Sequence, residues 1–250
     1  MIELKKLSAG YENNAVLKDV NVSFEKGKLT VLVGINGSGK STLIKTAAGI
    51  IPRMDGEISI DGNELSSLSP KARAKKIAYL SQGRFVPDMT VGELVLCGRF
   101  PHLSFPRVYS EKDRRIALEK MEQLSIAHLE NHHLSTLSGG MRQKAYVAMS
   151  LAQESDYILL DEPTTYLDIA HQIELMNILK AIAESGKGLI AVLHDLPLAM
   201  NYADDIAVLA DGTIKIKASP CEILRSGIIP TTFGIGVSRT ENGYGYLYDL

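Results

Sequence analysis

The stretch GINGSGKST, residues 34–42, constrains this chain more than any other part of its sequence. It follows the apolar run Leu29–Val33 and leads into a second apolar stretch at Leu43–Ala48, so the order is strand, glycine-rich loop, helix. Glycines let the backbone fold around an anion with its N–H groups pointing inward, and a helix N-terminus adds unpaired donors and partial positive charge. The segment therefore predicts a phosphate-binding loop in an α/β fold.

Individual residue types in this loop match the chemistry of a nucleotide. Lys40 brings a full positive charge for the β- and γ-phosphates, and the Ser41 hydroxyl can ligate Mg²⁺. The residues of the loop predicted to bind the nucleotide are Gly34, Asn36, Gly37, Ser38, Gly39, Lys40, Ser41 and Thr42. The alternative is a loop that caps a helix and binds nothing, and the strand–helix setting argues against it.

Two adjacent acids, Asp161 and Glu162, end the apolar run that starts at Tyr157. Two carboxylates are costly to bury unpaired, and the tips of parallel strands are where α/β sheets bind ligands. Asp161 is therefore predicted to hold Mg²⁺, and Glu162 to activate or orient the water that attacks the γ-phosphorus. In isolation, an acidic strand end exposed to solvent is equally compatible with this pattern.

His194 and Gln82 end two further predicted strands, in LIAVLHD and YLSQG. Taken alone, such a histidine is more often a satisfied core residue, and such a glutamine a surface amide. The segment LSGGMRQ is more informative, because it places Ser138, Gly139 and Gly140 before a helical pattern. A hydroxyl, bare backbone and a helix N-terminus form a second anion-binding end. Whether one nucleotide touches both ends stays open from the residues alone.

Apolar runs and helical signals alternate along the chain in the manner of an α/β protein. Runs bounded by glycine or charged residues predict buried strands of a mostly parallel sheet at Leu29–Val33, Ile77–Leu80, Ile158–Leu160, Leu189–Leu193 and Ile206–Leu209. Between Thr90 and Glu154 the pattern becomes helical, with capping boxes at Thr90/Glu93 and Ser110/Asp113. These signals predict a helical lobe inserted into an α/β core.

Composition excludes several other classes of protein. The formal net charge of −2 gives no basis for binding nucleic acid, and the most apolar stretch, 188–200, is too short to cross a bilayer, so we expect a soluble protein. The histidines of AHLENHH lack further ligands for a zinc site and are predicted to be solvated. A solvated face is also expected for the arginines of the helical lobe, Arg99, Arg107, Arg114 and Arg115. The glycine- and tyrosine-rich tail, 231–250, is predicted to form an edge hairpin.

These strings, in this order, resemble the nucleotide-binding subunit of the ATP-binding cassette (ABC) family over nearly the whole chain. GINGSGKST resembles Walker A, LSGGMRQ the signature motif, and ILLDEP Walker B with its catalytic glutamate. Gln82 falls at the Q-loop and His194 at the switch histidine. Tyr11 with Val16 resembles the aromatic loop that stacks on adenine, and Asp168 matches the D-loop. Tyr166 and Leu193 depart from the small or hydroxyl residues common at their positions, but neither removes a ligand group.

The resemblance implies one ABC ATPase domain over residues 1–250, with a P-loop NTPase fold. Its RecA-like, mostly parallel core would cover about 1–85 and 155–250, with an N-terminal antiparallel β part and an α-helical subdomain at about 86–154. Two subunits would pair head to tail around two MgATP, so that Ser138, Gly139 and Gly140 act on the partner's nucleotide. The resemblance further implies catalytic roles for Lys40, Gln82, Glu162 and His194, and Mg²⁺ ligation by Ser41, Gln82 and Asp161.

A subfamily signal follows the Q-loop position. TVGELVLCGRFPHLSFP resembles the GRxPH-like string of importers of iron–siderophore, haem and cobalamin chelates. That resemblance implies a homodimer held by two permease subunits on the cytoplasmic face of the membrane, supplied by an extracellular or periplasmic substrate-binding protein. Importers of bare metal ions or oxyanions are the nearest alternatives. A soluble ABC switch and an ordinary P-loop kinase are more distant ones, and the kinase would leave LSGGMRQ without a role.

Overall fold

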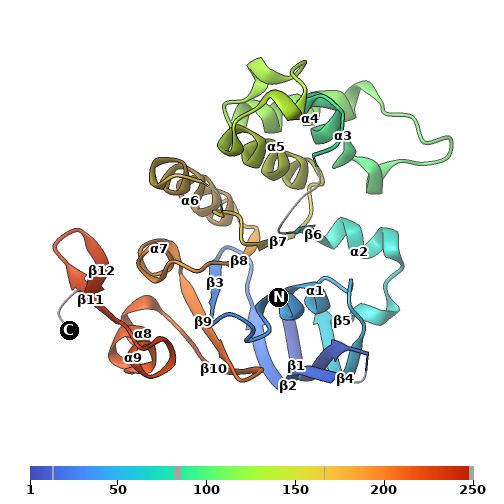
Figure 1. The fold of residues 1–250 in the computed structure, drawn as a ribbon. Coiled ribbons are helices and arrows are strands. Elements are labelled where there is room, and N and C mark those ends of the chain that lie inside the picture. Colours follow the sequence, from blue (N-terminus) through green and yellow to red (C-terminus); the bar gives the residue numbers. More distant parts are fainter. Residues whose placement is uncertain (13, 82–85, 166, 248–250) are drawn as a thin grey trace.

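The computed structural model describes residues 1–12, 14–81, 86–165 and 167–247. Two β-sheets lie against each other with helices around them, and further helices gather at one end (Figure 1). The helices are α1 (Lys40–Ala47), α2 (Pro70–Lys76), α3 (Val91–Cys97), α4 (Glu111–Gln123), α5 (Gly139–Ala152), α6 (Ile169–Glu184), α7 (Leu196–Tyr202), α8 (Pro220–Arg225) and α9 (Ile228–Phe233). The strands are β1 (Ile2–Tyr11), β2 (Asn14–Phe24), β3 (Leu29–Val33), β4 (Arg53–Ile60), β5 (Asn63–Glu64), β6 (Ile77–Leu80), β7 (Tyr157–Asp161), β8 (Gly188–Val192), β9 (Asp205–Ala210), β10 (Thr213–Ala218), β11 (Gly236–Thr240) and β12 (Gly243–Leu247).

The larger sheet has the strand order β10-β9-β3-β8-β7-β6. Its pairs are parallel except for β9 with β10, so the prediction of a mostly parallel sheet is confirmed. The predicted strands agree with the observed ones to within one residue at each end. Because β3 lies between β8 and β9, the loop that follows β3 lies beside the carboxyl end of β8.

Alternate residues of the parallel strands belong to two different apolar cores. Val31 and Val33 pack in the core that also contains buried residues of α5, α6 and α7. Leu32 packs in the other core, with Leu43 and Ile44 of α1 and the inner side of β1 and β2. Successive side chains of a strand point to opposite faces, so a sheet covered on both faces needs apolar residues at every position. This is why the parallel strands are continuous apolar runs in the sequence.

An antiparallel sheet of order β2-β1-β4-β5 forms the N-terminal part of the molecule. The strands β1 and β2 pair along most of their length, with Tyr11 opposite Asn14. Buried residues of this sheet, among them Ile2, Leu4 and Leu17, cover α1 from the side opposite to the parallel sheet. The antiparallel β part implied by the resemblance is confirmed.

Helices α3, α4 and α5 lie together at one end of the molecule (Figure 1). Both predicted capping boxes are present: the amide of Glu93 donates to Thr90 Oγ1 at 3.3 Å, and Ser110 with Asp113 repeats the arrangement. The predicted solvated arginine face is correct for Arg107, Arg114 and Arg115. It is wrong for Arg99, whose side chain is 4% exposed and pairs with Asp113.

The glycine- and tyrosine-rich tail forms the hairpin β11–β12, as predicted, but not at the edge of a larger sheet. It is a separate two-stranded sheet that lies against α7, because the side chain of Asn201 pairs with the backbone of Tyr244. Residues 248–250 lie outside the described part of the chain. In that described part, no helix has both the length and the apolar character needed to cross a bilayer.

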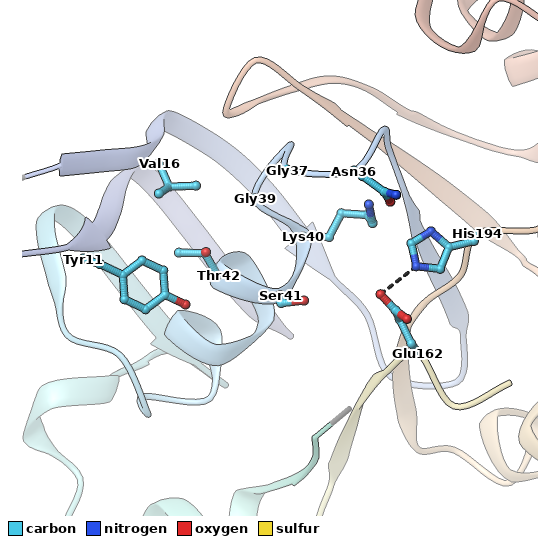
Figure 2. Close-up of a pocket in the computed structure, with 10 residues that line it drawn as sticks. All are labelled: Tyr11, Val16, Asn36, Gly37, Gly39, Lys40, Ser41, Thr42, Glu162 and His194. Carbon is cyan, nitrogen blue, oxygen red and sulfur yellow. Dashed lines mark ion pairs between the residues drawn. The ribbon is translucent and has the colours of Figure 1, made fainter. Parts of the chain in front are cut away.

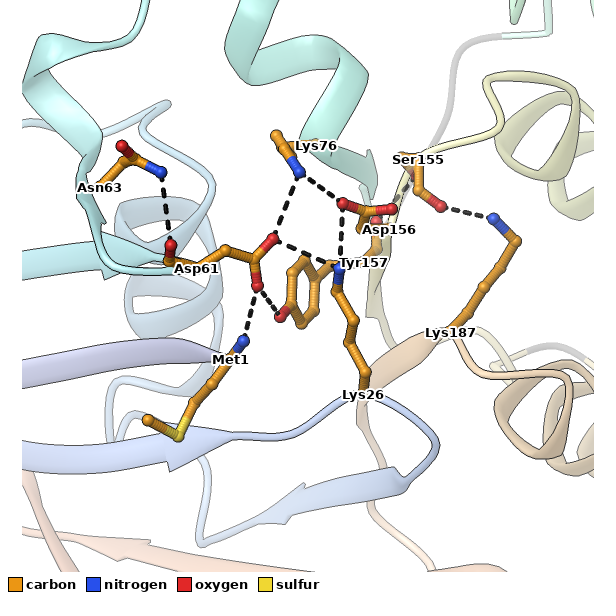
Figure 3. Close-up of polar contacts among 9 residues, drawn as sticks. All are labelled: Met1, Lys26, Asp61, Asn63, Lys76, Ser155, Asp156, Tyr157 and Lys187. Atoms are coloured by element: carbon orange, nitrogen blue, oxygen red, sulfur yellow. Dashed lines mark hydrogen bonds and ion pairs between the residues drawn. The ribbon is translucent and has the colours of Figure 1, made fainter.

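A polar cluster joins the two sheets at the start of β7 (Figure 3). The Asp61 carboxylate accepts from the N-terminal ammonium at 2.7 Å and from the Tyr157 hydroxyl at 2.8 Å. Lys76, the last residue of α2, pairs with both Asp61 (3.3 Å) and Asp156 (2.7 Å), and Lys26 pairs with the same two carboxylates. The cluster therefore fixes the antiparallel sheet and α2 against the end of β7 that is remote from Asp161.

Candidate functional site

A cavity of about 800 Å³ lies where the two sheets and the loop after β3 meet (Figure 2). Among the described residues, each of the ten that line it was predicted to belong to the site. They are Tyr11, Val16, Asn36, Gly37, Gly39, Lys40, Ser41, Thr42, Glu162 and His194. The antiparallel sheet supplies the first two, the loop and α1 supply the next six, and the segments after β7 and β8 supply the acid and the histidine.

Two glycines of the loop are required by its geometry. Gly39 has φ of 104° and is the N-cap of α1, a conformation that L side chains rarely adopt. Gly34 is constrained by space, because a Cβ there would lie 2.3 Å from the carbonyl oxygen of Leu209 on β9. These constraints fix the path of the backbone from β3 into α1.

The Lys40 side chain folds back over the loop. Its Nζ donates to the carbonyl oxygens of Gly34 at 2.8 Å and Ile35 at 3.0 Å. Burial lowers the pKa of the Lys40 ammonium, and the carboxylates of Glu162 and Asp161 oppose that shift. A buried ammonium with neutral acceptors gains most from a nearby anion, so this position favours a phosphate ligand.

One buried hydroxyl in the loop has no protein partner. Ser38 Oγ is enclosed and makes no hydrogen bond within the described residues. An unpaired buried hydroxyl costs free energy, and phosphate oxygens are strong acceptors. Together with the free N–H groups at the start of α1, this orphan donor fits a polyphosphate bound in the loop.

Asp161 is 1% exposed at the end of β7 and is held by two hydroxyl groups. Ser41 Oγ donates to Oδ1 at 2.9 Å, and the Tyr79 hydroxyl donates to Oδ2 at 3.2 Å. Burial raises the pKa of the Asp161 carboxyl, while these two hydrogen bonds act in the opposite direction. A hard cation that prefers oxygen ligands would find a carboxylate and a hydroxyl already adjacent here.

Glu162 and His194 form an ion pair on one side of the cavity, with Oε1 and Nε2 2.6 Å apart (Figure 2). Glu162 has a backbone φ of 53°, a conformation that is uncommon outside glycine and that is found at functional sites. Its other oxygen, Oε2, accepts from Thr165 Oγ1 at 3.1 Å. The carboxylate is thus oriented by two residues while it faces the cavity.

The second predicted anion-binding end does not line this cavity. Ser138 is the N-cap of α5, and its hydroxyl accepts from the amide of Met141 at 3.3 Å. A Cβ on Gly140 would lie 2.9 Å from the imidazole of His171, so only glycine fits there without displacement of that ring. Ser138, Gly139 and Gly140 therefore lie at the N-terminus of α5, on another part of the same chain.

Asp168 lies within the described part of the chain, whereas Gln82 does not. Asp168 is the N-cap of α6, and its Oδ1 accepts from the amide of His171 at 2.9 Å and contacts His171 Nδ1 at 2.7 Å. Gln82 and Tyr166 lie outside the described residues.

Sequence reasoning missed Tyr79, Thr165 and His171. Tyr79 could have been found, because it lies near the carboxyl end of a predicted strand, where neighbouring parallel strands bring their last residues together. Thr165 lies only three residues after Glu162. His171 gave no signal, because its contact with Gly140 spans separate elements.

A family model described as ABC transporter matches residues 17–165. The chain belongs to the ABC transporter family. As an ABC ATP-binding subunit it binds ATP and hydrolyses it, and the cavity in Figure 2 brings residues of the GINGSGKST loop together with Glu162 and His194. The predicted family, fold class and activity are confirmed.

Characterised relatives support this membership along most of the chain. The achromobactin transport ATP-binding protein of Dickeya dadantii is 36% identical, over 94% of this chain and 88% of the relative. The ferric enterobactin transport ATP-binding protein of Escherichia coli is 38% identical, over 92% of this chain and 86% of the relative. The hemin import ATP-binding protein of Burkholderia ambifaria is 36% identical, over 98% of this chain and 97% of the relative.

Solved structures share the whole arrangement of elements. A putative metal-chelate type ABC transporter in an inward-facing conformation matches with a TM-score of 0.84 and 25% identity, over 99% of this chain and 98% of the other. A dimeric bacterial ABC transporter cassette matches with a TM-score of 0.77 and 30% identity, over 88% of this chain and 99% of the other.

Proposed function

We propose that two copies of this ABC subunit close head to tail around two MgATP and drive a membrane importer of metal chelates. The observation that supports the dimer most directly is the division of the site. Residues of the GINGSGKST loop, Glu162 and His194 line one cavity, whereas Ser138–Gly140 lie at the N-terminus of α5, elsewhere on the chain. A second copy would bring its own signature to the open side of the cavity, as the dimeric cassette relative suggests.

Within that sandwich each residue has a chemical task. The Walker A amides and Lys40 would neutralise the phosphates, and Tyr11 with Val16 would contact the adenine. Glu162 would orient the attacking water and accept its proton, and His194 would hydrogen-bond the γ-phosphate. The contact between Glu162 and His194 supports this assignment, because it places the carboxylate and the imidazole together beside the cavity.

Mg²⁺ fits the residues present. Ser41 and Asp161 would hold the ion, and it would supply charge neutralisation between the β- and γ-phosphates. Gln82 is proposed as a further ligand and as the sensor that relays closure to a permease. Asp168 is proposed to act across the dimer. The helical segment at about 86–154 is proposed to move as a subdomain of a single domain, against a core at about 1–85 and 155–250.

The import of iron–siderophore, haem or cobalamin-type chelates is supported by the relatives. Their names specify achromobactin, ferric enterobactin and hemin, and the GRFPH string resembles the same subfamily. We therefore propose two permease partners, a substrate-binding protein outside the membrane, and a peripheral position on the cytoplasmic face. The selectivity for one chelate would then lie in those other chains.

The sandwich is tested with Glu162→Gln. We expect turnover to fall by about 10²–10⁴-fold, because the general base is lost, while ATP binding remains and the closed dimer accumulates. Size-exclusion chromatography with and without MgATP measures the dimer, and phosphate release measures turnover. Glu184→Gln, at the exposed end of α6, is the matched control. A Glu162→Gln protein that hydrolyses ATP at the parent rate would reject Glu162 as the base.

The importer assignment is tested by co-expression with the permease genes that accompany such subunits. Co-purification with a polytopic membrane protein, and stimulation of ATPase by that protein, are the expected results. Metal analysis and mass spectrometry of the complex then identify the chelate. A bare metal ion or an oxyanion as cargo would overturn the chelate assignment but leave the ATPase motor in place.

A further inference from the structure

The string Gly98-Arg99-Phe100-Pro101-His102, which distinguishes this subfamily in the sequence, binds the last turn of α5. Gly98 ends α3 directly against that helix, and a Cβ on it would lie 2.1 Å from the carbonyl oxygen of Met149. No side chain fits in this contact. The glycine of the string therefore allows α3 and α5 to meet backbone to backbone.

Arg99 joins three segments at the same place. Its Nη1 donates to the carbonyl oxygen of Ala152 and to Glu154 Oε2, both at 2.7 Å, and its Nε donates to Asp113 Oδ1 at 3.0 Å. The last carbonyls of a helix lack partners within the helix, and a cation is favourable at that end of the helix dipole. Arg99 thus caps the C-terminus of α5 and ties it to the first turn of α4.

His102 caps the next carbonyl. Its Nε2 lies 2.9 Å from the carbonyl oxygen of Gln153, and since a carbonyl only accepts, Nε2 is the donor. The side chain of Gln153 continues the connection, because its Nε2 donates to the carbonyl oxygen of Ile77 at 2.8 Å, where α2 passes into β6. Lys71 on α2 donates to the carbonyl oxygen of Leu103 at 2.6 Å. The end of α5 is thereby fixed to the α/β core.

The other end of α5 begins with the signature motif. The helix has 14 residues, so its ends are about 21 Å apart, and a tilt of about 5° at the clamped end would move the first turn by about 2 Å. A displacement of about 1 Å in a catalytic constellation can change rates by about two orders of magnitude. The contacts at the last turn of α5 therefore set where Ser138 and Gly140 lie.

We propose that Gly98, Arg99 and His102, here called the α5 clasp, are positioning residues for the signature motif. The clasp holds α5 in the orientation that places Ser138 and Gly140 on the nucleotide bound by the partner copy. This inference rests on the proposed ATP sandwich. It gives the subfamily string a role in dimer closure, distinct from nucleotide binding by Walker A.

The test uses His102→Leu, His102→Gln and His128→Leu in a Glu162→Gln background. His128 is an exposed histidine of the same helical segment, so His128→Leu is the matched control. We expect His102→Leu to raise the MgATP concentration for half-maximal dimerisation by about three- to ten-fold, the effect of one lost hydrogen bond. ATP binding to the monomer, followed with a fluorescent nucleotide, should stay within about two-fold of the parent. His102→Gln supplies an amide donor in place of the imidazole N–H and should restore most of the dimerisation.

In a background with Glu162 intact, His102→Leu should raise the ATP concentration for half-maximal hydrolysis and leave the rate at saturation near that of the parent. A purely structural role would lower the melting temperature without this separation. Unchanged dimerisation of His102→Leu, or an equal loss of nucleotide binding by its monomer, would overturn the clasp. If the Glu162→Gln parent itself forms no dimer with MgATP, the sandwich fails, and the clasp fails with it.

Discussion

Tyr11 is 50% exposed, although it lines the cavity together with Val16 (Figure 2). It is the last residue of β1, where it pairs with Asn14 of β2, and its ring lies beside the cavity. A ring that is half exposed beside this loop contributes little to the stability of the fold, because much of its apolar surface stays in contact with water. Its position fits a stacking surface for a base.

Removal of that ring should weaken nucleotide binding. We expect Tyr11→Ala to cost about 1–3 kcal/mol of ATP affinity, the range for stacking of a base on an aromatic side chain. Tyr11→Phe keeps the ring and should bind ATP like the parent. The affinity of Tyr11→Ala for GTP should fall together with its affinity for ATP, because every base has a π-face. Isothermal titration of the monomer measures both. An unchanged affinity for Tyr11→Ala would place the adenine elsewhere.

Burial disfavours the charged forms of both Lys40 and Asp161. Burial lowers the pKa of Lys40 and raises that of Asp161, because the loss of water penalises an ammonium and a carboxylate alike. A triphosphate beside the ammonium and a divalent cation beside the carboxylate would reverse both effects. The two residues thus make the cavity more favourable for a metal–nucleotide complex than for either component alone.

Helix α7 connects His194 to the C-terminal hairpin. It begins two residues after His194, and the amide of Leu196 in its first turn donates to the Tyr246 hydroxyl at 3.3 Å. Asn201 in its last turn donates to the carbonyl oxygen of Tyr244 at 3.1 Å and accepts from its amide at 2.9 Å. This amide pair mimics a strand-to-strand contact, and it holds β12 against the helix.

Loss of the amide pair should release the hairpin. We expect Asn201→Ala to destabilise the protein by about 1–2 kcal/mol and to speed hydrogen exchange at the amide of Tyr244. Asn201→Asp keeps the acceptor and should protect that amide better than alanine does. Exchange measured by mass spectrometry over residues 234–247 gives the result. Equal exchange in the parent and in Asn201→Ala would mean that other contacts hold the hairpin.

The two larger sheets enclose the cavity at one end of β7 and are joined by the Asp61 cluster at the other (Figure 3). Burial acts to raise the pKa of Asp61, but bonds from the N-terminal ammonium, Tyr157 and Lys76 outweigh it and hold the pKa well below the usual range. The carboxylate therefore stabilises the folded state. Since the cluster orients the sheets, it also supports the cavity between them.

The stability provided by Asp61 should depend on pH. Its folded pKa lies below the unfolded value of about 3.9, so the contribution is complete above about pH 5 and is lost as the pH falls through and below 4. We expect Asp61→Asn to lower the free energy of unfolding by about 1–3 kcal/mol at pH 7, with a smaller difference near pH 3. Urea unfolding at several pH values measures it, with the exposed Asp211→Asn as control. A difference that does not shrink in acid would contradict this account.

Elements that depend on neighbouring residues could be predicted from the sequence alone. The buried strands were predictable because both faces of the sheet are covered, which forces continuous apolar runs such as Leu29–Val33 and Leu189–Leu193. The capping boxes were predictable because each joins residues three positions apart. The phosphate loop was predictable for the same reason, since its donors are consecutive in the chain.

Contacts between distant segments could be seen in the folded structure but not in the sequence. Three contacts join residues that are more than a dozen positions apart. They are the hydrogen bond from the Tyr79 hydroxyl to Asp161, the pairing of Arg99 with α4 and α5, and the packing of the hairpin on α7. Side-chain type does not encode such partners, because an arginine can be solvated or can cap a buried helix end with the same local sequence. Arg99 is the clearest case: its position in a basic group predicted solvent, and the packing of three helices placed it in the interior.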